Sequence, residues 1–262
     1  MSHHSTTERI EKPHKGESKL HFQRYEFKYH IPIHLADKIL PGLLNYMDFD
    51  EHIETGQNFY DVHSVYLDSP NFKNYHEKIE GELFRKKLRV RTYSKDPKKD
   101  TNVFVEIKRK YDAVIIKDRT VMTLEAATSL CHGKIDYDLL RSENHAVIDE
   151  FLQDKMMYAM RPKVLVSYKR KPLVSRNGMN LRVTFDYDIE ALRVSNVDFS
   201  KATKPIFPGM CVLEIKFNDM LPYWLHSVIQ NYKLEAWPYS KYCFGVENSY
   251  LIERMMNPSS EG

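Results

Sequence analysis

The chain has 262 residues, of which 42% are hydrophobic, 12% aromatic and 29% charged. These proportions exclude bulk disorder, and the length suits one large domain or two small ones. The 39 basic and 36 acidic residues give a net charge of only +3. This balance excludes a surface that is basic throughout and coats nucleic acid, so any polyanion site must be local.

No apolar run approaches the roughly 18 residues that a membrane span needs, and the first residues lack the apolar stretch of a signal peptide. The three cysteines, Cys131, Cys211 and Cys243, are odd in number and widely separated. They indicate buried free thiols rather than a disulfide framework or a zinc site. We therefore expect a cytoplasmic protein with no membrane insertion and no nucleic-acid partner.

The predicted elements begin after a tail. Residues 1–21 are rich in His, Ser, Lys and Glu without periodicity, which predicts disorder. Strand patterns follow at 22–31, 62–67, 84–93, 103–110, 114–122, 163–171, 181–187 and 211–217, and helical patterns at 34–47, 124–132, 137–157, 223–232 and 244–255. Arg176-Asn177-Gly178 predicts a hairpin turn between two of the strands. We expect a single domain over residues 22–256 and a second tail at 257–262.

Most of the predicted strands have one ionic and one apolar face, because side chains alternate along a strand. The first strand, for example, has Glu26 and Lys28 on one face and Tyr25 and Phe27 on the other. The residues that share the ionic faces are Arg24, Glu26, Lys28, Lys87, Arg89, Arg91, Glu106, Lys108, Lys110, Lys117, Arg119, Arg170, Arg182, Thr184, Asp186, Glu214 and Lys216.

A single strand of this kind indicates the solvent face of a sheet. The repetition of Arg and Lys with isolated carboxylates across so many strands favours another arrangement, in which the sheet closes and the ionic faces point inward. Cations that converge in the narrow interior of eight strands repel one another unless an anion or a metal lies among them. The predicted fold is therefore α+β, an eight-stranded antiparallel β-barrel with flanking helices and an ionic lumen.

Phosphate chains suit such a lumen, since Arg binds phosphoryl oxygens in bidentate fashion and Lys acts as a point charge. The predicted ligand is a triphosphate, such as that of ATP, or a polyphosphate, with Lys216 and Arg119 among the substrate-binding candidates. Carboxylates repel phosphate but hold Mg²⁺ or Mn²⁺, which makes Glu26, Glu106 and Glu214 candidate metal ligands. The alternative for these glutamates is to pair with neighbouring Arg or Lys.

Eight strings in order resemble the VTC-type polyphosphate polymerase domain: RYEFKY, LRVRTY, VFVEIKRK, VIIKDR, LVSYKRKPL, LRVTFDYDIEA, VLEIKF and PYSKYCFGVE. The similarity covers residues 22–250. That family belongs with the triphosphate tunnel metalloenzymes, alongside the CYTH-type triphosphatases and adenylyl cyclases. The resemblance implies an eight-stranded antiparallel tunnel, which agrees with the alternation of the strands.

The resemblance also implies roles for individual residues. Tyr168 and Ser240 match hydroxyls that touch phosphate, and Glu214 matches the metal-binding glutamate. The phosphate-gripping basic positions are Lys28, Arg89, Arg91, Lys108, Lys117, Arg170, Arg182 and Lys241. The implied reaction transfers the γ-phosphoryl group of ATP to a growing polyphosphate chain and releases ADP, with Mn²⁺ or Mg²⁺ as cofactor. Such chemistry needs positioning and charge stabilisation rather than a nucleophilic side chain.

Two departures from the family patterns matter. Arg24 stands where the CYTH-type signature has its first Glu, which favours the polymerase over the hydrolase branch. Trp237 and Pro238 stand where a basic residue is expected before Ser240 and Lys241, which predicts weaker binding of the polyphosphate chain. Two alternatives remain open, a triphosphate tunnel hydrolase that uses water as acceptor and a non-catalytic polyphosphate-binding module.

Overall fold

A computed structural model describes residues 24–51, 53, 58–112, 114–134, 145–218, 220–238 and 240–251. The predicted tails at 1–21 and 257–262 lie outside these residues. The described chain is an antiparallel sheet with flanking helices, so the α+β class is confirmed. Among the described residues, none of the helices combines the length and the apolar character that crossing a membrane requires.

Eight long strands form the sheet in the order β1-β10-β8-β7-β3-β4-β5-β6. Their bounds are β1 Arg24–Pro32, β3 Tyr60–Asp68, β4 Phe84–Thr92, β5 Asn102–Tyr111, β6 Val114–Thr123, β7 Arg161–Ser175, β8 Leu181–Arg193 and β10 Met210–Asn218. All eight predicted strands are present. Two short strands were missed because they are too short to alternate, β2 Met47–Phe49 on β7 and β9 Lys204–Pro205 on β8.

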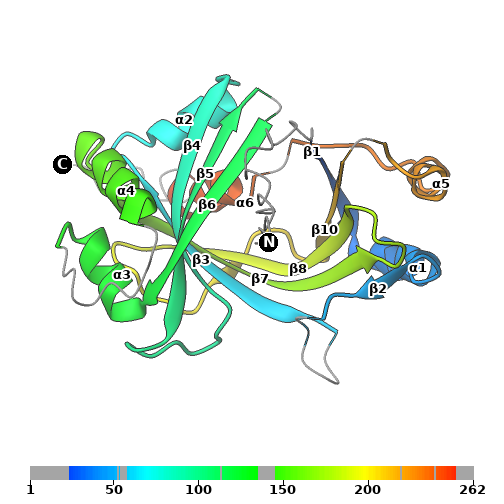
Figure 1. Ribbon diagram of the computed structural model, residues 1–262, viewed down its shortest axis with the longest axis horizontal. Coiled ribbons are helices and arrows are strands. Elements are labelled where there is room, and N and C mark those ends of the chain that lie inside the picture. The colour runs from blue at the N-terminus through cyan, green and yellow to red at the C-terminus, as the bar shows by residue number, and fades with distance from the viewer. Residues whose placement is uncertain are drawn as a thin grey trace, which may run out of the picture.

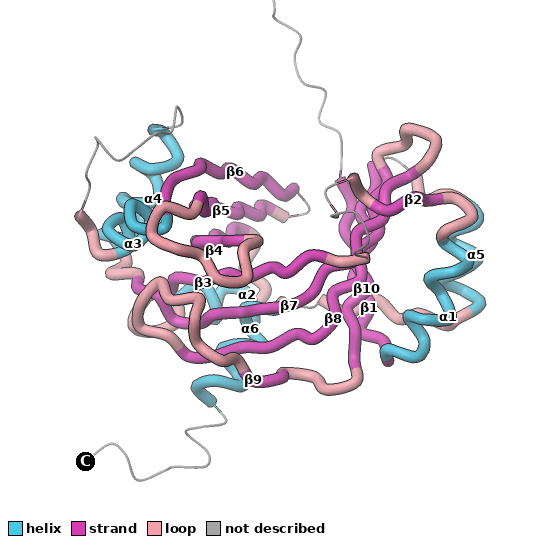
Figure 2. The backbone as a smooth tube through the Cα atoms, turned by 90° about the horizontal axis from the view of Figure 1, so that it is seen from below, coloured by secondary structure: helices cyan, strands magenta, loops and turns pink. Residues whose placement is uncertain are grey.

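The sheet curls, so that one face of its strands is turned inward, but its backbone ladder does not close (Figure 2). The concave side of the curled sheet is here called the tunnel. Within the described residues, no pairing joins β1 to β6, the two ends of the strand order. The walls meet through side chains instead, since Lys108 Nζ of β5 lies 3.6 Å from Glu26 Oε2 of β1. The closure expected from the sequence is therefore not made by backbone hydrogen bonds, which would bring the two strands to about 4.8 Å from each other. Ionic side chains span the gap between β1 and β5 instead, and the barrel is open.

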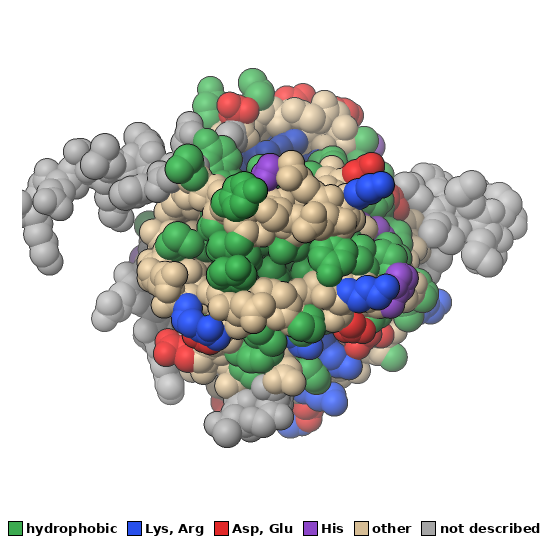
Figure 3. Space-filling view, turned by 90° about the vertical axis from the view of Figure 1, so that its right-hand side faces the viewer, with side chains coloured by type: hydrophobic (Ala, Val, Ile, Leu, Met, Phe, Trp, Pro, Cys, Tyr) green, Lys and Arg blue, Asp and Glu red, His purple; other side chains and the backbone are tan. Residues whose placement is uncertain are grey.

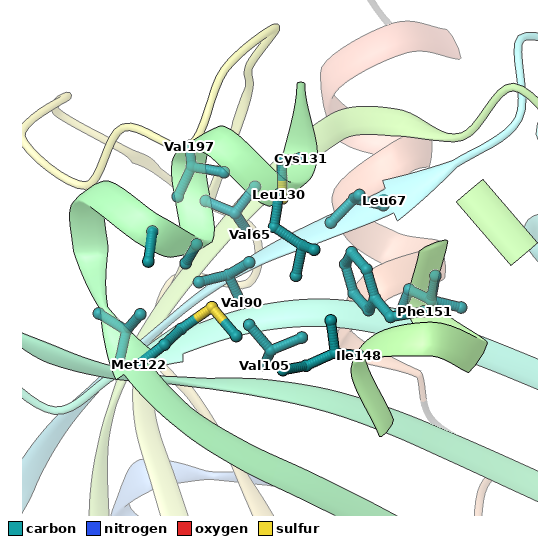
Figure 4. Packing of buried hydrophobic residues seen from close by; sticks show 14 of the residues in the cluster. Val65, Leu67, Val90, Val105, Met122, Leu130, Cys131, Ile148, Phe151 and Val197 are labelled. Atoms are coloured by element: carbon teal, nitrogen blue, oxygen red, sulfur yellow. The ribbon is translucent and has the colours of Figure 1, made fainter. Parts of the chain in front are cut away.

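Two helices cover the outer face of the sheet at one side, α3 Leu124–Cys131 and α4 His145–Met157 (Figure 1). Thr123 begins α3 by accepting a hydrogen bond from Ala126 N at 3.2 Å, as N-cap threonines do. Beneath both helices lies a buried cluster that includes Val90, Val105 and Phe151 (Figure 4). The start of the predicted 137–157 helix lies outside the described residues, and α4 is seen from His145.

Helices α1 Ile33–Leu43 and α5 Tyr223–Asn231 cover the other side, over β1, β8 and β10. Figure 3 looks onto this side, where hydrophobic side chains gather between charged ones. The rings of Tyr46 and Trp224 stack there, with centroids 4.4 Å apart. The apolar faces of the flanking strands are thus directed outward, under helices, and the opposite faces line the tunnel.

The C-terminal helix α6, Lys241–Val246, continues as a π-helical turn, Glu247–Leu251, and packs on the inner face of the sheet against β7 and β8. The predicted 244–255 helix thus begins three residues earlier, and its last four residues lie outside the description. Close packing requires Gly245, because a Cβ there would lie 2.8 Å from Val164 Cγ1. Helix α2, Lys73–Ile79, lies beside α6 and was not predicted.

Two smaller expectations are also settled. The 176–180 connection between β7 and β8 is a turn, in which Gly178 has a φ of +67° and Asn177 has no positive φ. The three cysteines are free and buried, as predicted.

Candidate functional site

The tunnel gathers most of the predicted basic residues on the inner faces of the strands and at the start of α6. Three buried groups form around carboxylates, one at Glu106, one at Glu26 with Glu214, and one at Asp186. Because alternate residues share a face, the sequence pattern that marks each strand also brings these side chains together.

Glu106 lies on β5 with its side chain fully buried, opposite Arg89 in the cross-strand register. Arg89 Nε donates to Glu106 Oε2 at 2.6 Å, and Arg91 Nε lies 3.9 Å from the same oxygen. Lys117 Nζ of β6 lies 3.6 Å from Oε1. Burial raises the pKa of Glu106, but the charges of Arg89, Arg91 and Lys117 outweigh burial and lower it to about 2.

Two hydroxyl groups extend this first group along β3. Arg89 Nη1 donates to Tyr66 Oη at 3.1 Å, and Arg91 Nε donates to Ser64 Oγ at 3.0 Å. Burial raises the pKa of Tyr66, yet the neighbouring guanidinium charges of Arg89 and Arg91 prevail and lower it. The guanidinium groups are thus held on one side by a carboxylate and on the other by hydroxyls, which fixes their orientation.

The second group joins β1, β10 and β5. Lys28 Nζ lies 2.6 Å from Glu26 Oε1 and 3.9 Å from Glu214 Oε2, and Lys216 forms an ion pair with Glu214. Burial and the charge of Glu214 raise the pKa of Glu26, but Lys28, Lys108 and Lys216 lower it to about 2. Burial lowers the pKa of Lys108 to about 7, although Glu26 partly opposes the shift.

The third group links β7 and β8 to α6. Arg170 donates to both oxygens of the fully buried Asp186, at 2.7 and 2.8 Å, and Lys241 Nζ lies 2.6 Å from Asp186 Oδ2. Both cations flank the ring of Tyr168, whose centroid lies 5.2 Å from Arg170 Cζ and 4.8 Å from Lys241 Nζ. The Tyr168 hydroxyl is 3.5 Å from Arg91 Nη2, which connects this group to the first.

Two predicted residues lie apart from these groups. Arg182 Nη2 donates to Asp50 Oδ2 at 2.6 Å, and 39% of the Arg182 side chain is exposed. Arg119 is exposed and places its guanidinium carbon 4.9 Å from the centre of the Phe104 ring. The structure brings both to the inner faces but not into the buried groups. The side chain of Arg24 lies outside the description.

The candidate metal ligands divide in the same way. Glu26 and Glu214 both lie beside Lys28, whereas Glu106 lies beside Arg89 and Arg91. Across the described residues, no three His, Cys, Asp or Glu side chains gather as a metal site. Two hard carboxylate ligands do fit Mg²⁺ or Mn²⁺, because such ions usually take one or two carboxylates and fill their other positions with water and phosphate oxygens. Glu26 with Glu214 is therefore the pair that suits a divalent cation.

Three residues that were not among the site candidates predicted from the sequence also line the tunnel. Lys87 Nζ donates to Ser240 Oγ at 2.8 Å, Asp186 anchors Arg170 and Lys241, and Tyr66 binds Arg89. Lys87 and Asp186 carried a usable signal, since both share the ionic parity of their strands. Tyr66 carried little, because its strand has mostly apolar and hydroxyl residues on that face.

A model of the VTC domain matches residues 23–250 of the chain. The chain belongs to the VTC domain family. No curated protein matches the sequence. The VTC domain assignment agrees with the antiparallel tunnel and its ionic lining, and it is consistent with a domain of the triphosphate tunnel type.

Solved structures with a similar outline include two described as candidate adenylate cyclases. The one from Bacillus halodurans is 12% identical, with a TM-score of 0.47, and the similarity covers 83% of this chain and 95% of that one. The one from Vibrio parahaemolyticus is 12% identical, with a TM-score of 0.45 and coverage of 85% and 97%. A protein from Pyrococcus horikoshii is 10% identical, with a TM-score of 0.42 and coverage of 86% and 99%.

Proposed function

We propose that the tunnel binds the triphosphate of ATP and a polyphosphate chain, and transfers the γ-phosphoryl group of ATP to that chain with release of ADP. The observation that supports this proposal is the excess of converging cations over carboxylates. The carboxylates are Glu26, Glu106, Asp186 and Glu214, and the cations are Lys28, Lys87, Arg89, Arg91, Lys108, Lys117, Arg170, Lys216 and Lys241. A bound polyanion would offset their mutual repulsion.

The arginines are preset for such a ligand. Arg89 uses Nε for Glu106 and Nη1 for Tyr66, so within the described contacts its Nη2 donors stay available to phosphate oxygens. Arg170 is held by Asp186 through two hydrogen bonds. Phosphoryl transfer depends on positioning and charge stabilisation, and donors oriented before the ligand arrives supply both without reorganisation.

Glu26 and Glu214 are the proposed ligands for Mn²⁺ or Mg²⁺, which would neutralise charge on the phosphate oxygens during transfer. Lys28 and Lys216 neutralise these carboxylates in the structure as described. If phosphate binds beside Glu26 and Glu214, the ammonium groups of both lysines can turn from these carboxylates to the phosphoryl oxygens. The two lysines would thus balance the negative charge of the glutamates before binding and that of the phosphate afterwards.

A second candidate is a non-catalytic polyphosphate-binding module. The observation that favours it is that Glu26 and Glu214 are already paired with lysines, so their negative charge is balanced without a metal. A tunnel hydrolase differs from the polymerase only in using water as the acceptor. We further propose a cytosolic location, where ATP is available and where three free thiols are expected.

The deciding experiment incubates the full chain with ATP and Mn²⁺, separates the products on a gel stained for polyphosphate, and assays ADP and free phosphate in parallel. A polyphosphate ladder with ADP and little free phosphate supports the polymerase. Free phosphate without a ladder identifies the hydrolase, and tripolyphosphate binding without turnover identifies the binding module.

A matched pair of variants sharpens the assay. Glu214→Gln should abolish turnover while tripolyphosphate still binds, because the cations remain. Glu125→Gln removes a glutamate whose side chain is 53% exposed and should leave turnover unchanged. Full turnover by Glu214→Gln would refute the proposed metal role.

A further inference from the structure

A pocket of about 530 Å³ lies on the outer face of the sheet, outside the tunnel. It is lined by His63 of β3 and Ser167 of β7, which share the parity of Val65 and Leu165, the residues that pack under α3 and α4. In the cross-strand register His63 is opposite Ser167, and Ser167 is opposite Glu190 of β8. The three side chains therefore form one row across strands that lie side by side in Figure 2.

The segment after β8 forms another wall of this pocket. Its short strand β9 pairs with β8, and Thr203 Oγ1 donates a hydrogen bond to Glu190. The apolar part of the lining includes Ile189, Phe199 and Phe207. A pocket of this volume, with apolar walls and a few polar groups, is typical of sites that bind small organic molecules.

His63 brings a buried polar atom without a partner to the pocket. Its Nδ1 lies 2.9 Å from Ser167 Oγ, and within the described residues its Nε2 is buried and has no hydrogen-bond partner. Burial lowers the pKa of His63, although the charges of Asp61 and Glu190 oppose the shift. The ring is then neutral at neutral pH, and when Nδ1–H donates to Ser167, Nε2 is an acceptor. A buried acceptor of this kind costs free energy until a donor reaches it.

The charges beside His63 are mainly negative. The charged residues that line the pocket are Asp61, Asp188, Glu190, Lys169 and the exposed Lys201. Lys169 Nζ lies 2.9 Å from Asp188 Oδ2, so these two charges balance each other. In the described part of the chain, neither Asp61 nor Glu190 forms an ion pair. Two carboxylates and an imidazole acceptor thus stand ready for a positively charged donor.

These residues favour an organic cation over a metal ion. No three His, Cys, Asp or Glu side chains in the described ranges gather as a metal site, and a bare ion would make no use of the apolar walls. We propose that the pocket binds a small aliphatic amine. Its ammonium group donates to His63 Nε2 and to the carboxylates of Asp61 and Glu190, and its methylene groups lie against Ile189 and Phe199. The pocket lies outside the tunnel, so this inference does not rest on the proposed function.

The test uses titration calorimetry of the full chain in a phosphate-free buffer. Putrescine and spermidine are the amine probes, and butanediol and succinate are a neutral and an anionic chain of similar length to putrescine. Only the amines should bind, because the basic tunnel repels them and the acidic pocket attracts them. Asp61→Asn with Glu190→Gln should weaken amine binding by at least about tenfold.

The matched control, Asp96→Asn with Glu125→Gln, removes the same charge from side chains that are 72% and 53% exposed. It should change the affinity for the amines by less than about twofold. Melting temperatures show whether each variant folds. The proposal is overturned if the wild type binds neither amine, if butanediol binds as well as putrescine, or if the two double variants lose equal affinity.

A second variant gives the opposite sign and keeps the test decisive if the first double variant does not fold. Lys169→Gln removes a cation from the pocket and leaves Asp188 without its ion-pair partner. The Lys169 side chain is 44% exposed, so the fold should tolerate the change. The pocket becomes more negative, and amine binding should tighten about threefold or more. Unchanged or weaker binding in Lys169→Gln would overturn the electrostatic basis of the site.

Discussion

The inner face of the curled sheet has two unlike halves. On β1, β4, β5, β10 and the first part of β8 the inward residues are mainly Lys, Arg, Glu and Asp, and together with Arg170 near the end of β7 they are here called the ionic half. The inward positions of β3 and of the first part of β7 hold Val62, Val164 and Val166, which are buried together with Tyr242 and Val246 of α6. These residues are here called the apolar half. One alternation rule therefore produces a ligand-binding wall in one place and a helix-packing wall in the other.

The difference assigns distinct tasks to the two halves. The apolar half fixes α6, whose first residues are the ones that reach the ionic half, since Lys241 pairs with Asp186 and Ser240 binds Lys87. Packing is short-range and specific in shape, while the ionic half depends on the balance of buried charges. Substitutions in the two halves should therefore differ in what rescues them, and added polyanion should help only the ionic half.

The largest effect is expected for Asp186→Asn. Arg170 and Lys241 would lose their buried counter-charge, which should lower the free energy of unfolding by about 3–5 kcal/mol. Urea denaturation measures the loss, and tripolyphosphate should restore part of it. The control Asp188→Asn breaks the half-exposed pair with Lys169 and should cost less than about 1 kcal/mol. A fully stable Asp186→Asn would contradict charge balance in the ionic half.

The next effect is a pH dependence carried by Glu106. Its pKa is lowered from 4.5 to about 2 in the folded chain, so it stabilises the fold above pH 4.5 and loses that contribution as the pH falls through 2. The contribution at neutral pH is on the order of 3 kcal/mol. Glu106→Gln should therefore be less stable than the wild type at pH 7, with a difference that shrinks toward pH 2. A difference that is constant with pH would rule out this ionic role.

Gly245→Ala examines the apolar half at its closest contact. The added Cβ would lie 2.8 Å from Val164 Cγ1 and 3.3 Å from Val166 Cγ2, and such overpacking costs about 1–3 kcal/mol. Gly42→Ala is the matched control, because nothing lies within 4 Å of its Cβ position in α1 and alanine favours a helix by up to about 1 kcal/mol. In thermal melts, tripolyphosphate should raise the melting temperature of Gly245→Ala by no more than it raises that of the wild type.

Much of the ionic half was accessible from sequence, because alternation alone places Arg89, Glu106 and Lys108 on one face. Alternation does not say which partner a charge takes. The pairing of Glu106 with arginines and of Glu26 and Glu214 with Lys28 depends on strand order and tilt. The apolar half was missed, because the contact of α6 with β7 is a long-range packing choice that no local pattern in either segment encodes.

The smallest effect is expected at Arg119, which has the parity of the ionic half but stays exposed above Phe104. A cation–π contact of this kind is worth about 0.5–1 kcal/mol, so Arg119→Ala should lower stability by no more than that. Its tripolyphosphate affinity should change less than about twofold, because the guanidinium lies outside the three carboxylate groups. Arg119→Lys should lower stability less than Arg119→Ala, since a cation remains over the Phe104 ring. A tenfold loss of affinity in Arg119→Ala would show that the ligand extends to β6, and would move the boundary of the ionic half to include the exposed end of that strand.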